Sequence, residues 1–161
     1  MTYDFKLSCT LPASPEAVYD AWLDSACHGA MTGAPARIGK RVGEFYAAWD
    51  GYIVGATLEL VPGRRIVQSW RTSDFASNDR DSTITVELEP TKTGTRLTLT
   101  HTGVPDGQTD YQNGGWRDFY FSPMKAYFAR ENRPKPATKR SPKPSTQSSA
   151  PGRGPRRSRN A

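Results

Sequence analysis

The chain has 161 residues, a formal net charge of +6 and a hydrophobic fraction of 35%, which suits one small domain and is low for a fully packed chain. The charge is uneven: residues 130–161 hold ten Lys and Arg and one acid (+9), whereas residues 1–129 hold twelve Lys and Arg and fifteen acids (−3). The first 129 residues therefore lack the general basic surface of a nucleic-acid-binding domain.

The N-terminal segment predicts a strand followed by two short helices. From Tyr3 to Leu11 apolar and polar residues alternate, as in a half-buried strand. Ser14-Pro15-Glu16 is a helix start, because serine caps free N–H groups, proline has no N–H to leave unpaired and glutamate suits the positive helix end. Asp24 is expected to start a second short helix towards His28.

The middle of the chain predicts antiparallel strands. After a loop over 29–40, strands resume near Val42, and Asp50-Gly51 is typical of a tight two-residue hairpin turn. Four further strands are expected, in two hairpins, at Tyr52–Val61, Arg65–Arg71, Ser82–Glu89 and Thr95–Thr102.

The last element is predicted to be a helix of about twenty residues, Asp110–Ala129. Its apolar residues recur at helical spacing and form one stripe, with Pro123 expected to kink the helix: Trp116, Phe119, Tyr120, Pro123, Met124, Tyr127 and Phe128.

These elements predict an α+β fold in which a curved antiparallel sheet of about six strands wraps around the long C-terminal helix. We expect this domain to occupy residues 1–129. Residues 130–161 contain six prolines and, apart from alanine, no apolar side chain, so we expect a disordered basic tail.

A family resemblance supports this fold over roughly residues 3–129. The middle strands carry Gly43-x-Phe45, Asp50-Gly51, Glu59-Leu60-Val61-Pro62 and Trp70-Arg71, and the last helix carries Gly115-Trp116-Arg117-Asp118-Phe119-Tyr120-Phe121 and Pro123-Met124-Lys125-x-Tyr127-Phe128. Together with Ala34-Pro35-Ala36, these residues resemble the C-terminal domain of Aha-type activators of the heat-shock-protein-90 ATPase.

The resemblance implies the helix-grip fold of the START, polyketide-cyclase and birch-pollen-allergen families, which often encloses an apolar cavity between helix and sheet. It also implies a heat-shock-90-type chaperone as a possible partner. Full-length activators carry a separate N-terminal domain that drives stimulation. Because this sequence starts with the C-terminal-like domain, we expect no stimulation by the domain alone.

The candidate ligand-binding residues are Trp70, His101, Trp116 and Tyr120. Trp116 and Tyr120 lie one helical turn apart on the face that would cover a cavity, and His101, with Arg71 and Glu59, is a possible polar anchor. Core packing is the alternative interpretation for each tryptophan, and a structural role is the alternative for His28 and His101.

The sequence offers no sign of a cofactor, a metal site or a catalytic constellation. The two cysteines, Cys9 and Cys27, form no C-x₂-C pair, and neither histidine lies in a ligand motif. No signal peptide is visible at the N-terminus, and no apolar run approaches the ~20 residues that span a bilayer. We therefore expect a reduced, cytoplasmic protein without membrane contact.

The tail is the one candidate for contact with nucleic acid or another polyanion. Arg153, Arg156, Arg157 and Arg159 close a run of cations that can neutralise phosphates but that has no aromatic residue to stack on bases. A merely solvated tail is the alternative.

Two functions remain open from the sequence. The first is a non-catalytic domain that binds a partner protein or a small apolar ligand. The second is an enzyme of the polyketide-cyclase or hydrolase type that uses the same cavity, and a buried acid or a histidine pair open to a substrate would favour it.

Overall fold

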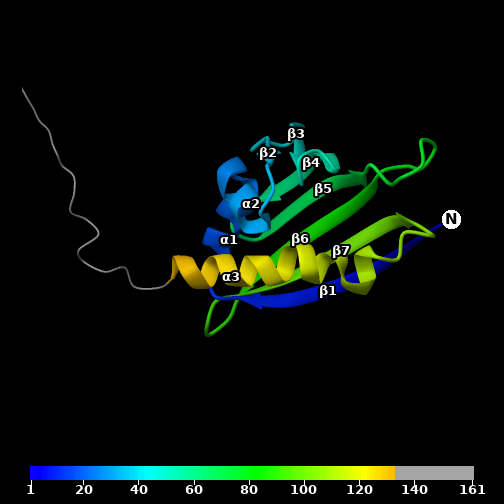
Figure 1. The fold of residues 1–161 in the computed structure, drawn as a ribbon. Helices are drawn as coiled ribbons and strands as arrows, with labels where there is room; N and C mark the ends of the chain where they lie inside the picture. Colours follow the sequence, from blue (N-terminus) through cyan, green and yellow to red (C-terminus); the bar gives the residue numbers. More distant parts are fainter. Residues whose placement is uncertain (133–161) are drawn as a thin grey trace, which may run out of the picture.

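The structure is a computed structural model that describes residues 1–132. A seven-stranded antiparallel sheet in the order β1-β7-β6-β5-β4-β3-β2 holds helices on one face, with α3 lying along the sheet and α1 and α2 beside it (Figure 1). The predicted α+β class is thus confirmed, with seven strands in place of about six. The extra strand is β2, whose two residues are too few to show a period of alternation.

The elements follow the predicted order. Their bounds are β1 Thr2–Leu11, α1 Pro15–Leu23, α2 Ser25–Thr32, β2 Arg37–Ile38, β3 Phe45–Ala48, β4 Ile53–Val61, β5 Arg65–Thr72, β6 Ser82–Pro90 and β7 Thr95–Pro105, followed by a helical segment in three parts at Tyr111–Gly115, Arg117–Phe121 and α3 Ser122–Glu131.

The short helices begin at the predicted caps. The Ser14 side chain accepts a hydrogen bond from the backbone N–H of Ala17, and the Asp24 side chain accepts one from Cys27. The second helix runs past His28 to Thr32, so the predicted loop is shorter than expected.

The alternation of each central strand places its apolar residues in one core under the helices. On β5 the buried residues are Ile66, Gln68, Trp70 and Thr72, and on β6 they are Ser82, Ile84, Val86 and Leu88. Ile84 on β6 pairs with His101 on β7, which in turn pairs with Phe5 on β1. This register places β1, from the start of the chain, beside the β6–β7 hairpin beneath the helical segment.

The hairpin after β3 has four residues, Trp49 to Tyr52, because Ala48 pairs directly with Ile53. Trp49, Asp50 and Gly51 all have positive φ angles, of 51°, 55° and 89°. The tight two-residue turn predicted here is therefore wrong. Asp50 and Gly51 have the positive φ angles expected of Asp-Gly. Trp49 has a positive φ as well, which is uncommon for a bulky residue.

The C-terminal segment is helical but not a single α-helix. Residues 111–115 and 117–121 form wider turns, in which the N–H of Gly115 bonds the carbonyl of Asp110 and the N–H of Ser122 bonds that of Arg117. The non-helical residues are Asn113 and Gly114, whereas Trp116, Phe121 and Ser122 have helical angles and α3 continues through Pro123. The kink predicted at Pro123 is thus found ten residues earlier.

Wider turns also shift the apolar stripe. Buried positions recur every four residues at Trp116, Tyr120, Met124 and Phe128. Phe121 is buried as well, whereas Phe119 is 55% exposed. A turn closed by i→i+5 bonds contains more residues than an α-turn, so a face that is continuous at α-helical spacing rotates away from the core. The prediction that Phe119 belongs to the buried stripe is therefore wrong.

The helix ends two residues after the predicted position, and the Asn132 side chain donates a hydrogen bond to the carbonyl of Pro12. The remaining tail residues, with Arg153, Arg156, Arg157 and Arg159, lie outside the described residues, as does the expected disorder. No helix among residues 1–132 is long and apolar enough to cross a membrane.

Candidate functional site

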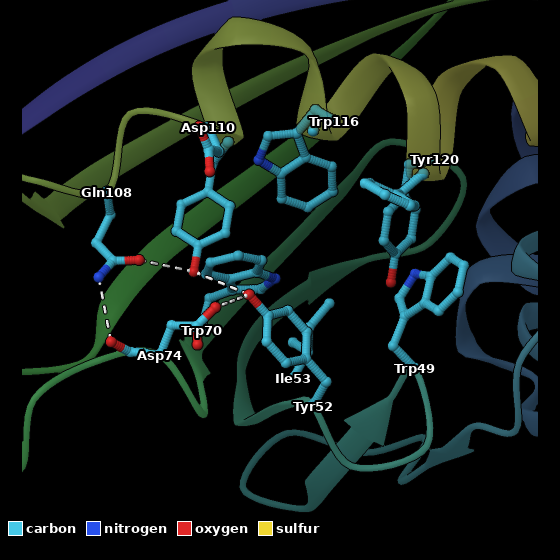
Figure 2. A pocket seen from close by; sticks show the side chains of 12 residues that line it. Trp49, Tyr52, Ile53, Trp70, Asp74, Gln108, Asp110, Trp116 and Tyr120 are labelled. Atoms are coloured by element: carbon cyan, nitrogen blue, oxygen red, sulfur yellow. Dashed lines mark hydrogen bonds between the residues drawn. The ribbon is translucent and has the colours of Figure 1, made fainter.

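A pocket of about 370 Å³ lies between the helical segment 111–120 and the ends of β4 and β5. Figure 2 shows Trp116 and Tyr120 pointing from the helical segment towards residues of the sheet and of the hairpin that follows β3. Seven of its twelve lining residues are aromatic: Trp49, Tyr52, Trp70, Tyr111, Trp116, Phe119 and Tyr120. The other five are Ile53, Asp74, Gln108, Asp110 and Gly115.

Two glycines set the direction in which the helical segment covers the pocket. Gly114 has a φ of 137°, which an L side chain rarely adopts. At Gly115 a Cβ atom would lie 2.9 Å from the carbonyl oxygen of Asp110. The chain can therefore turn sharply here and start the next helical turn with Trp116 directed at the sheet.

Aromatic rings pack edge to face and tilted across the pocket walls. The centroid of Trp116 lies 4.9 Å from that of Tyr120 and 5.6 Å from that of Trp70, and the Trp70 centroid lies 4.9 Å from that of Tyr111. These separations fall within the favourable range for aromatic pairs. Trp70, Trp116 and Tyr120 are thus packed against other rings and are buried in the pocket wall.

A hydrogen-bond network closes one end of the pocket. The Tyr111 hydroxyl lies 2.6 Å from Oγ1 of Thr72 and 3.3 Å from the hydroxyl of Tyr52, which donates to a carboxylate oxygen of Asp74 at 2.7 Å. Gln108 accepts from Tyr111 and donates to the backbone carbonyl of Asp74 (Figure 2). Burial is the main cause that raises the pKa of Tyr111, and Asp74 is the one acidic side chain in this network.

His101 lies behind the pocket wall and does not line it. Its Nδ1 accepts a hydrogen bond from the indole N–H of Trp116 at 3.1 Å, which leaves the proton on Nε2. Nε2 lies 2.9 Å from Oγ of Ser82, which donates in turn to the carbonyl of Trp70. Every polar atom in this series of hydrogen bonds is paired when the imidazole of His101 is neutral. Burial lowers the pKa of His101 to about 3.

His28 holds Tyr120 by a hydrogen bond, as His101 holds Trp116. Its Nδ1 lies 2.8 Å from the carbonyl of Trp22, which can only accept, so Nε2 accepts from the hydroxyl of Tyr120 at 2.8 Å. Burial lowers the pKa of His28, and it raises that of Tyr120. Both histidines are thus enclosed and fully bonded, as the structural interpretation of the sequence expected.

Of the four candidate ligand residues, Trp70, Trp116 and Tyr120 line one pocket and His101 supports it from behind. Arg71 and Glu59 lie elsewhere: Arg71 bonds backbone carbonyls and Asp81 in the loop after β5, and Glu59 pairs with Arg65. Ligand binding by the four residues stays a prediction.

Sequence reasoning missed Tyr111, Asp74 and Gln108 and left Trp49 out of the four candidate ligand residues. Tyr111 precedes the apolar stripe, and Asp74 and Gln108 lie in loops without periodicity. Trp49 carried a signal, because a tryptophan inside a turn is an unusual place for a large apolar side chain. Its indole nitrogen is shielded from solvent and has no partner within residues 1–132, which costs about 1–3 kcal/mol.

Within residues 1–132 no group of three or more His, Cys, Asp or Glu side chains is arranged to hold a metal. Cys9 and Cys27 are not bonded to each other, and burial raises the pKa of the Cys9 thiol to about 11. Over the same range each Asp and Glu side chain has access to solvent.

Comparison with known proteins identifies the family. Residues 12–129 match the family model "Activator of Hsp90 ATPase homolog 1-like protein". The activator of 90 kDa heat shock protein ATPase homolog 1 of Homo sapiens is 30% identical over 128 residues, which cover 79% of this chain and 37% of the human protein. The activator homolog of Dictyostelium discoideum is 26% identical over 129 residues, covering 80% of this chain and 33% of that protein.

Solved structures show the same fold. An HSP90 activator from Plasmodium falciparum has a TM-score of 0.72 at 24% identity, covering 79% of this chain and 96% of that one. A protein in the dynemicin biosynthetic locus has a TM-score of 0.66 at 16% identity, covering 80% of this chain and 48% of that one. These likenesses confirm the helix-grip fold expected from the sequence.

The chain spans little more than a third of the length of the human activator homolog. The family match nevertheless extends from the end of β1 to the last turns of α3, and so includes every lining residue of the pocket. The chain therefore belongs to the Activator of Hsp90 ATPase homolog 1-like family.

Proposed function

We propose that the domain is a non-catalytic binding module whose aromatic pocket takes a small, largely apolar ligand. The observation that carries this proposal is the pocket of about 370 Å³ in which seven of twelve lining residues are aromatic. Ligand sites in proteins are mostly apolar cavities with a few polar groups that orient the ligand, and this pocket has its polar groups at one end.

The indole N–H of Trp49, which has no partner among residues 1–132, supports the same proposal. A ligand oxygen or a water molecule that reached this atom would recover the cost of leaving a donor buried without a partner. The positive φ of Trp49 has a cost of its own, and such strain persists where the surrounding structure holds it. The backbone N–H of Asp50 does so by bonding the carbonyl of Pro35 at 2.9 Å.

The experiment is native mass spectrometry of the full chain purified from its own host. We expect a co-purifying small molecule that Ile53→Trp excludes, since Ile53 is buried at the pocket wall. Leu58→Trp is the matched control, because Leu58 is 49% exposed and does not line the pocket. A folded Ile53→Trp protein that retained the same molecule in the same amount would refute the assignment of the ligand to this pocket.

A second candidate function is binding to a heat-shock-90-type chaperone. The observation that favours it is the 30% identity to a human protein named as an activator of the 90 kDa heat shock protein ATPase. The test is a pull-down and a coupled ATPase assay with the chaperone from the same organism. We expect binding without stimulation, and several-fold stimulation by residues 1–161 would contradict that expectation.

The enzymatic alternative requires a buried acid or a histidine pair open to a substrate. In the described residues His28 and His101 are buried and fully hydrogen-bonded, and neither is a lining residue of the pocket. Nothing at the pocket therefore favours this alternative over binding.

A further inference from the structure

The pocket has a one-sided charge. Asp74 and Asp110 are the only charged residues among the twelve that line it, which include no Lys, Arg or His. Both are exposed on the solvent side of the pocket. The Asp74 carboxylate accepts one hydrogen bond from Tyr52, and the Asp110 carboxylate has no hydrogen bond or ion pair within residues 1–132.

The nearest arginines in the sequence do not neutralise these carboxylates. Arg71 donates to the carbonyls of Ala76 and Asp79 and pairs with Asp81, and its guanidinium lies 5.5 Å from the ring centroid of Phe75. Arg117 pairs with Asp118, its neighbour in the chain. An anionic ligand would meet two carboxylates here without a compensating cation, so charge selects against it.

Beyond the carboxylates, the pocket consists mainly of aromatic rings. The face of an aromatic ring carries partial negative charge and attracts a cation within about 6 Å of its centroid, most strongly for tryptophan. Trp49, Trp70 and Trp116 all line the pocket. Ring faces and carboxylates thus favour the same sign of charge on a ligand.

Given a small-ligand pocket as proposed above, we propose that its ligand is a small organic cation, with an ammonium group on an apolar body. The apolar body packs among the tryptophans, and the ammonium group lies near Asp74 and Asp110. The proposal rests on the proposed function for the existence of a ligand and adds the sign of its charge.

The test compares three probes of the same frame with the full chain: 2-phenylethylammonium, 2-phenylethanol and phenylacetate. Binding is followed by tryptophan fluorescence and by NMR line shifts at low and at physiological salt. We expect the cation to bind about tenfold or more tightly than the alcohol at low salt, the alcohol to bind more tightly than the anion, and the preference for the cation to shrink as salt is added.

Two variants locate the effect. Asp74→Asn with Asp110→Asn keeps an acceptor for Tyr52 and should remove most of the preference for the cation over the alcohol, leaving only the part that the ring faces supply. Asp20→Asn with Glu89→Gln removes two negative charges at exposed residues that do not line the pocket, and this control should preserve the preference for the cation.

Equal binding of cation and alcohol, or tightest binding of the anion, would overturn the inference and leave a small-ligand pocket in place. Failure of all three probes to bind would count against the small-ligand function itself, and the inference would fall with it.

Discussion

The stability of the domain should fall as the pH is lowered from 7.5 to 4.5, and His101 should account for a large part of the loss. The unfolded imidazole binds a proton near its ordinary pKa of 6.5, whereas the buried one does so only near 3. Between these values the unfolded state holds more protons, so protonation favours unfolding. The stabilisation is fully present above pH 6.5 and is lost progressively below it.

The magnitude follows from the two pKa values. For one such histidine the loss between pH 7.5 and 4.5 is about 2–3 kcal/mol. His28, whose pKa is lowered in the same direction, adds to it. The window is chosen because carboxyl groups titrate mainly below about pH 4.5. The cause is burial of the ring, and a proton on Nδ1 of His101 would also face the indole N–H of Trp116.

The assay is urea unfolding at half-unit pH steps, followed by tryptophan fluorescence and far-UV circular dichroism. His101→Gln keeps an acceptor and a donor but cannot titrate, so its free energy of unfolding should be lower at pH 7.5 yet vary less with pH. The same pH dependence in His101→Gln and in the unmodified chain would refute the reasoning and place the titrating group elsewhere.

Three further predictions concern the last helix and the tail. Trp116→Ala should lower the free energy of unfolding by about 3–5 kcal/mol, because it leaves a cavity and unpairs His101. Phe119→Ala, at the exposed rim, should lower it by less than about 1 kcal/mol. Equal losses in urea unfolding would show that the helix is placed wrongly. A chain ending at Asn132 should melt within one or two degrees of the full chain, and a drop of ten degrees in calorimetry would show that the tail packs on the domain. Any affinity for nucleic acid should depend on residues 130–161, which carry a charge of +9. In a filter-binding assay this affinity should fall by orders of magnitude from low to physiological salt. Binding that persists in the shortened chain would contradict this prediction.

The fold could be predicted because its signals are local. Alternation in Tyr3–Leu11 and Ser82–Glu89, the capping residues Ser14 and Asp24, and the apolar spacing of the last helix each depend on neighbours within a few residues. The prediction that Phe119 is buried was wrong because the signal that decides it is not local. The turns at 111–121 depend on Gly114 and on packing against the sheet, and a sequence period read as 3.6 cannot reveal them.

The pocket could be predicted only in part, because it is assembled from three separate segments, 49–53, 70–74 and 108–120. Trp70 lies on β5 and Trp116 and Tyr120 on the helical segment, which a helix-on-sheet fold brings together. Asp74 and Gln108 come from loops whose conformation depends on long-range contacts, such as the bond between the Gln108 side chain and the Asp74 backbone. The sequence pattern therefore could not predict the negative charge of the pocket, or the positive charge proposed for its ligand.

The two histidines connect these observations. His101 fixes the indole of Trp116 and His28 fixes the hydroxyl of Tyr120, so two residues one turn apart on the helical segment are each held by an imidazole from a different element. A candidate anchor for a ligand thus acts as an anchor for the pocket wall. Because the bond from Trp116 requires an unprotonated Nδ1 on His101, the geometry of the pocket and the stability of the fold depend on the same neutral ring. If His101→Gln lost ligand binding, the weaker hold on the indole of Trp116 would explain the loss. A direct contact between the ligand and His101 would not be needed.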